Sequence, residues 1–325
     1  MDNTKTLRIW DEKFNAGFRK QNIDKIIDVV KESDDLLFHI RGNYINVYYL
    51  GTEILKYSNT AFRFNKDYFS GIIPTEFQKG INDFETWHKN LPIMKDAIYK
   101  RNFGGKKKKL EKAAQQRIIQ TVNSNSESEY YILDMEFVRS GCRFGRFDMI
   151  AVKKEPDENC KHKVAIIELK YGKESFKTSY SIEKALKNVN PYGSGIVGHA
   201  YNLNSFIYGA KGESKSATEQ RLLSLAEELA SMSGVFHEKK LHPSPFLPKL
   251  DKSIIDVHDI KAWLLCVACD DSAIESVLKY LGYHLKPSKY CARNIVPNLD
   301  FCYKVTDKED VNSLIEKDFL KPYTK

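Results

Sequence analysis

The stretch over residues 146–172, RFDMIAVKKEPDENCKHKVAIIELKYG, decides the fold of this chain. Two strand-like runs, 144–154 and 163–171, are separated by a short polar connection and predict an antiparallel pair of strands. Because side chains alternate along a strand, Glu168 and Lys170 project from the same face, about 6.6 Å apart along the chain. A carboxylate and an amine at the end of an otherwise apolar run indicate a chemical task at that end of the strand.

The neighbouring residues extend this pair into a sheet with flanking helices. Residues 130–138 predict a third strand before the pair, and residues 108–122 predict a helix whose apolar residues recur four apart. Residues 195–210 predict a helix after the pair, and residues 261–271 predict a further buried strand. The order helix, three strands, helix, strand predicts an α/β domain with a mixed sheet (αβββαβ).

Phosphodiester hydrolysis accounts for the charged residues of these strands. The attacking water must lose a proton, and negative charge builds on the phosphate oxygens. Asp148 and Glu168, on adjacent strands, supply the oxygen ligands that a hard divalent cation prefers, and the carbonyl of Leu169 is a plausible further ligand. The ammonium of Lys170 can orient or deprotonate the water and meet the phosphate.

The segments RFDMIAV and VAIIELKYG resemble the D-Xn-(D/E)-X-K signature of the PD-(D/E)XK phosphodiesterase superfamily. The resemblance covers residues 105–212 and the strand at 261–269, and it implies a restriction-endonuclease-like αβββαβ core. It also implies a nuclease that needs Mg²⁺ or Mn²⁺, with Asp148, Glu168 and Lys170 as the core of its active site. Many members have proline before the aspartate, where this chain has phenylalanine.

The resemblance further implies an acidic residue on the first core helix. Glu111 matches best, and the alternative is an ordinary solvated pairing with Gln115. Glu136 is a second candidate for supporting the metal, and the alternative is an exposed strand face. In the run 130–138 the side chains are expected to divide between two faces. Tyr131, Leu133, Met135 and Phe137 share one face, and Asp134 and Glu136 lie on the other.

Two further sets of residues are candidates for contacting the substrate. His199 and Asn202 are three apart on the helix after Lys170, and relatives often place substrate-facing residues there. A plain polar pair on a helix surface is the simpler alternative. Lys106, Lys107, Lys108 and Lys109 could contact a phosphate backbone, although such charge runs are often only solvated.

Cys266 and Cys269 have the spacing of a metal-binding pair, and some nucleases of this superfamily hold an iron–sulfur cluster. The pair lies in WLLCVAC, a predicted core strand, where cysteine behaves as a small apolar residue. Cys291 and Cys302 follow without a tight spacing. We therefore expect a core role for these cysteines.

The chain is expected to form two domains. Residues 1–104 predict a small N-terminal α+β domain, with short antiparallel strands in 36–58, and show no chemical motif. Residues 105–325 predict the nuclease-like domain. A helical insertion at about 213–255 includes a helix predicted over 217–231.

The bulk composition sets the remaining expectations. The chain has 325 residues, of which 42% are apolar, and 51 basic against 43 acidic residues give a net charge of +8. This excess fits a polyanionic partner but is too modest to identify one. The first 14 residues lack the apolar stretch of a signal peptide, and residues 262–269 are the longest strongly apolar run. We expect a cytoplasmic protein with no membrane partner.

A nuclease acting on DNA in restriction, repair or mobile-element defence is therefore the first expectation. An RNA-directed nuclease on the same core is an alternative. A catalytically idle member that binds nucleic acid or protein is another. The sequence leaves open the base specificity, the cut pattern and the oligomeric state, for which a homodimer is one option.

Overall fold

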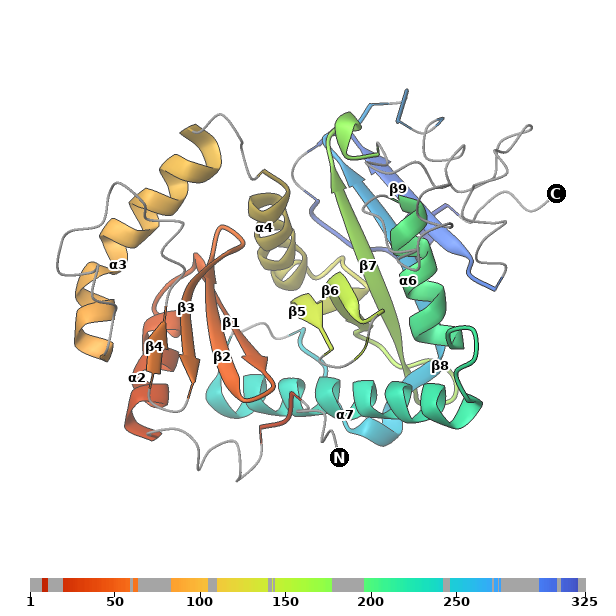
Figure 1. The fold of residues 1–325 in the computed structure, drawn as a ribbon, viewed down its shortest axis with the longest axis horizontal. Helices are drawn as coiled ribbons and strands as arrows, with labels where there is room; N and C mark the ends of the chain where they lie inside the picture. Colours follow the sequence, from red (N-terminus) through yellow and green to blue (C-terminus); the bar gives the residue numbers. More distant parts are fainter. Residues whose placement is uncertain are drawn as a thin grey trace. The chain divides into compact units, whose positions relative to one another are not determined.

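The computed structural model describes residues 8–10, 20–58, 61–63, 83–104, 110–139, 142, 144–176, 196–241, 246–270, 272–273, 275, 298–308 and 311–320. These residues form a mixed α/β structure with one antiparallel sheet, one mixed sheet and, within the described ranges, five α-helices (Figure 1). The chain divides into two compact units. The first contains Met1–Gln120 and Glu227–Lys252, and the second contains Thr121–Ala226 and Ser253–Lys325.

The first unit contains a four-stranded antiparallel sheet. Its strands, in spatial order, are β1 (Leu36–Arg41), β2 (Tyr44–Tyr49), β3 (Thr52–Ser58) and β4 (Ala61–Arg63). The turn between β2 and β3 contains Leu50 and Gly51 at φ values of 48° and 67°. A Cβ at position 51 would collide with the carbonyl oxygen of Lys112, so glycine is required there. The antiparallel strands predicted in 36–58 are confirmed.

Besides the sheet, the first unit contains two helices and most of a third. They are α2 (Lys20–Lys31), α3 (Phe84–Tyr99), which continues into the π-helical turn η3 (Lys100–Gly104), and α4 (Leu110–Ser124). The side chain of Asp83 caps α3 by accepting the backbone N–H of Thr86 at 2.8 Å. Two hydrogen bonds of the Gln116 side chain connect α4 to the sheet region of this unit. The backbone N–H of Gly51 donates to Gln116 Oε1 at 2.7 Å, and Gln116 Nε2 donates to the carbonyl of Asp35 at 2.7 Å.

The long helix α7 (Lys215–Lys239) contributes to both units. Glu228 Oε1 accepts the backbone N–H of Arg8 at 3.4 Å, and Ser231 Oγ accepts that of Trp10 at 2.8 Å. These contacts join its second half to the N-terminal residues. The structural division therefore differs from a boundary at residue 104 and from a separate insertion over 213–255. The helix predicted over 217–231 is also longer in the structure.

The second unit contains the mixed sheet, in the order β5-β6-β7-β8-β9 (Figure 1). The strands are β5 (Tyr130–Val138), β6 (Arg146–Lys153), β7 (His162–Tyr171), β8 (Ile255–Val267) and β9 (Phe301–Thr306). The first three are antiparallel to one another, and β8 and β9 run parallel to β7. The predicted antiparallel meander is confirmed, and the buried strand predicted over 261–271 begins earlier.

A bulge interrupts the pairing of β5 with β6 between Ile132 and Asp134. Asn123, near the end of α4, closes it, because its side chain accepts the N–H of Ile132 at 2.8 Å and donates to the carbonyl of Ile132 at 2.9 Å. The extra residue reverses the alternation of side chains along the strand. The expected division of faces is therefore wrong at its start, since Tyr131 shares a face with Asp134.

Replacing Asn123 with alanine should lower the free energy of unfolding by about 1–3 kcal/mol, because the buried N–H of Ile132 would lose its acceptor. Denaturant unfolding of the variant beside Ser124→Ala, a change at the exposed neighbouring position, measures this cost. Equal stabilities of the two variants would show that the bulge closes without the asparagine.

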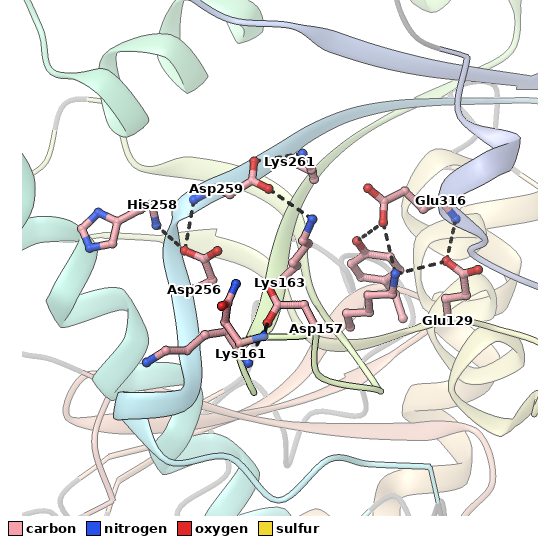
Figure 2. Close-up of polar contacts among 12 residues, drawn as sticks. Glu129, Asp157, Lys161, Lys163, Asp256, His258, Asp259, Lys261 and Glu316 are labelled. Carbon is pink, nitrogen blue, oxygen red and sulfur yellow. Dashed lines mark hydrogen bonds and ion pairs between the residues drawn. The ribbon is translucent and has the colours of Figure 1, made fainter.

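Charged residues at the start of β7 and in β8 form a neutralised cluster (Figure 2). Asp259 contacts Lys163 at 3.3 Å and Lys261 at 2.9 Å. Burial alone would raise the pKa of Asp259, but the hydrogen bonds and charges of the two lysines outweigh it and lower the pKa. Asp256 accepts the backbone N–H of His258 at 2.9 Å, which holds the irregular part of β8. These contacts give the cluster a structural role.

Helix α6 (Ile196–Tyr208) packs against the mixed sheet through Phe206. The ring of Phe206 meets those of Phe147 and Phe137 at centroid distances of 4.9 and 6.3 Å. The helix predicted over 195–210 is confirmed. In the part of the chain that the structure describes, no helix is long and apolar enough to cross a membrane.

Candidate active site

The regular pairing of β6 with β7 ends next to Asp148. The last paired residues are Met149 and Ile167, and the register continued by one residue brings Asp148 opposite Glu168. At this point Asp148 Oδ2 accepts the backbone N–H of Leu169 at 2.8 Å. A side-chain carboxylate therefore takes the place of a ladder carbonyl, which fixes Asp148 beside the Glu168-Leu169-Lys170 segment.

Glu168 is buried and ionised. Its side chain is 2% exposed, its Oε1 accepts a hydrogen bond from Lys170 Nζ, and its Oε2 lies 3.0 Å from His199 Nδ1. Burial by itself would raise the pKa of Glu168. The charges and hydrogen bonds of His199 and Lys170 outweigh burial and lower the pKa to about 2. The carboxylate therefore carries its charge at neutral pH.

Lys170 is also buried, with 8% of its side chain exposed. Its ammonium contacts Glu168 and donates to the carbonyl oxygen of Leu169 at 3.0 Å. On the other side of β7 it pairs in register with Cys266 of β8. The charged pair lies near the end of β7, and β8 and β9 extend the sheet beyond this strand. Asp148, Glu168 and Lys170 are brought together.

His199 and Asn202 both lie on α6, but their side chains have different surroundings. His199 reaches Glu168, so its role is more specific than that of a surface polar residue. Its spacing from Asn202 was visible in the sequence, but the partner of its ring was not. The buried Oδ1 atom of Asn202 has no hydrogen-bond partner among the residues that the structure describes. Substrate contact by either residue stays a prediction.

Glu136 lies on β5 opposite Asp148. The pairs Met135–Met149 and Phe137–Phe147 bracket the two residues, so their Cα atoms face each other across the strands. Glu136 has φ of 50°, a left-handed conformation that costs a non-glycine residue about 1–3 kcal/mol. Such strain is found most often at functional sites. The position suits support of a metal at Asp148, and that role stays a prediction.

The remaining candidates are Glu111, the lysine run and the cysteines. Glu111 belongs to the first unit, and its catalytic role stays a prediction. The run Lys106–Lys109 and Cys291 lie outside the described residues. Cys266 and Cys269 are 0% and 2% exposed, and burial raises the pKa of both thiols. Raised thiol pKa values disfavour the thiolate that binds metals.

The candidate metal ligands at the site are all oxygen atoms. Asp148 and Glu168 contribute carboxylates, and Leu169 contributes a backbone carbonyl. Among the described residues, no group of three or more His, Cys, Asp or Glu is arranged to hold a metal ion. Magnesium sites often use only one or two carboxylates, with waters and substrate phosphates as the other ligands. The donor set therefore fits Mg²⁺ or Mn²⁺.

The site is thus a buried Glu168–Lys170 pair with Asp148 on one side and His199 on the other, held by β6, β7 and α6. Comparisons of the chain with protein-family models, with curated proteins and with solved structures found no match.

Proposed function

We propose that this chain is a metal-dependent nuclease of the PD-(D/E)XK kind, which hydrolyses phosphodiester bonds in nucleic acid, with DNA as the first substrate class. One observation carries the proposal. A buried, ionised Glu168 is paired with Lys170 two residues along β7, and Asp148 of the neighbouring strand is anchored to the residue between them. The order of α4, the antiparallel strands β5 to β7, α6 and the parallel strand β8 along the chain supports the proposal, because a restriction-endonuclease-like core has the order αβββαβ.

The roles follow from the chemistry of the groups. Asp148, Glu168 and the carbonyl of Leu169 would hold a divalent cation, which when bound stabilises the charge on the phosphoryl oxygens. Lys170 Nζ, which contacts Glu168 and the carbonyl of Leu169, would orient the attacking water and meet the negative phosphate. His199 holds the second oxygen of Glu168, which fixes the direction of that carboxylate.

A second function has one observation in its favour. Both oxygens of Glu168 have cationic or polar partners within the protein, so the pair also suits a purely structural salt bridge. In that case the chain would be a catalytically idle nuclease-fold protein that binds nucleic acid or another protein. Cleavage that depends on a divalent cation separates the two functions.

Cleavage should require Mg²⁺ or Mn²⁺, stop in excess chelator, and return when the metal is restored. Calcium should support binding better than turnover, because it imposes a looser coordination geometry than Mg²⁺. The assay compares plasmid, linear duplex, single-stranded DNA and RNA at equal phosphate concentration. Cleavage that persists in chelator would contradict the proposed mechanism, and binding without cleavage under every metal condition would support the idle alternative.

A further inference from the structure

Arg146 lies beside the candidate carboxylates and has no part in the roles assigned above. It is the first residue of β6, two before Asp148, so both side chains leave the same face of the strand, about 6.6 Å apart along it. Arg146 is exposed, whereas Asp148 is half-buried. The guanidinium of Arg146 makes no hydrogen bond or ion pair with the described residues.

The cross-strand neighbour of Arg146 is also exposed. Arg146 pairs with Val138 of β5, whose side chain is 47% exposed. This pair lies at the end of the β5–β6 ladder, and Glu136 and Asp148 oppose each other two residues further into the strands. The carboxylates of Glu136 and Asp148 are therefore followed, toward the turn that joins β5 to β6, by the guanidinium of Arg146 and the apolar side chain of Val138.

The other described arginine of this hairpin has a different environment. Arg139 is 6% exposed, and its guanidinium carbon lies 5.8 and 5.9 Å from the ring centroids of Phe137 and Phe206. Contacts with these rings account for the position of Arg139. Among the residues that the structure describes, no such contact accounts for the position of Arg146, and its guanidinium can therefore bind an anion next to Asp148.

We propose that Arg146 binds a phosphodiester group of duplex DNA adjacent to the one that is cleaved. A guanidinium presents parallel N–H donors that match the oxygens of a phosphate, and an exposed apolar side chain beside it can contact the neighbouring sugar. Arg146 binds and positions the DNA backbone, and the hydrolysis itself is carried out by Asp148, Glu168 and Lys170. This assignment rests on the proposed nuclease function.

The test measures binding without cleavage. Duplex binding by Asp148→Asn is followed by fluorescence anisotropy between about 50 and 200 mM salt, and Arg146→Ala is added to that parent. Loss of one charge-assisted contact should weaken Kd by about tenfold. The slope of log K against log salt should fall in magnitude by about 0.9. Arg146→Lys should retain the slope and recover part of the affinity.

Arg63→Ala in the same parent is the matched control, because Arg63 is an exposed arginine on β4 of the first unit. It should leave the slope unchanged. An unchanged slope for Arg146→Ala, or an equal loss for the two arginines, would overturn the assignment and leave the nuclease proposal standing if the wild type cuts DNA. Absence of both binding and cleavage in the wild-type chain would overturn the nuclease proposal together with it.

Discussion

Asp148→Asn should reduce the rate of metal-dependent DNA cleavage by about 10²- to 10⁴-fold while leaving the protein folded. The amide oxygen of asparagine can still accept the backbone N–H of Leu169, so the hydrogen bond that holds β6 against β7 is retained. The lost property is the negative charge. Calorimetric titration should therefore show weaker Mg²⁺ binding, and single-turnover cleavage should fall with it.

Asp148→Ala removes the acceptor as well as the charge. It should lose cleavage to the same extent and also lower the free energy of unfolding by about 1–3 kcal/mol, because the N–H of Leu169 loses its partner. Comparing the two variants separates the catalytic carboxylate from its structural hydrogen bond.

Asp256→Asn is a matched control, since it makes the same substitution at a carboxylate that also accepts backbone N–H groups, in the cluster of Figure 2. It should cut DNA at the wild-type rate. Normal cleavage by Asp148→Asn would contradict the proposed function, whatever its effect on stability.

Lys170→Met should abolish cleavage and lower the free energy of unfolding by about 3–5 kcal/mol, because it removes the ammonium that is paired with the buried carboxylate of Glu168 and leaves the contact with His199. The double variant with Glu168→Gln should be more stable than the sum of the two single effects predicts, since no buried charge remains unpaired. Denaturant unfolding of the four proteins gives this coupling energy directly. Additive effects would show that the pair is not coupled in solution.

The same pair predicts a pH dependence with a definite sign. The pKa of Glu168 is about 2 in the folded chain, below its ordinary value of 4.5. A lowered carboxyl pKa stabilises the folded state at pH values above the ordinary pKa, and this stabilisation is lost as the pH falls toward the folded pKa. Wild-type stability should therefore fall more steeply than that of Glu168→Gln between pH 4.5 and about 2. Parallel curves for the two proteins would contradict the ionised, buried state of Glu168.

The strands around the site were predictable because their signals are local. The strand predicted over 130–138 has the expected bounds, and the helix predicted over 195–210 covers Ile196–Tyr208. The alternation of side chains along 163–171 was enough to place Glu168 and Lys170 on one face. Arg146 could have been found by the same rule, since it is two residues from Asp148 on the same strand.

Other features depend on partners that are distant in the sequence. The bulge in β5 is held by Asn123 of α4, so the residues of β5 alone do not predict it. The burial of Lys170 requires β8, which pairs parallel to β7 and follows it in the chain only after α6 and α7. The contact of His199 with Glu168 requires a particular rotation of α6, which hydrophobic spacing alone does not specify.

The sequence by itself determined the first three strands of the mixed sheet, their antiparallel order and the three candidate residues Asp148, Glu168 and Lys170, because period and turn composition act over a few neighbouring residues. Only the tertiary structure decided that Glu168 is buried, that His199 contacts it and that α4 and α7 divide between two units. Burial and ion pairing depend on which surfaces meet in the folded chain, and that choice is made by the packing of all the elements together.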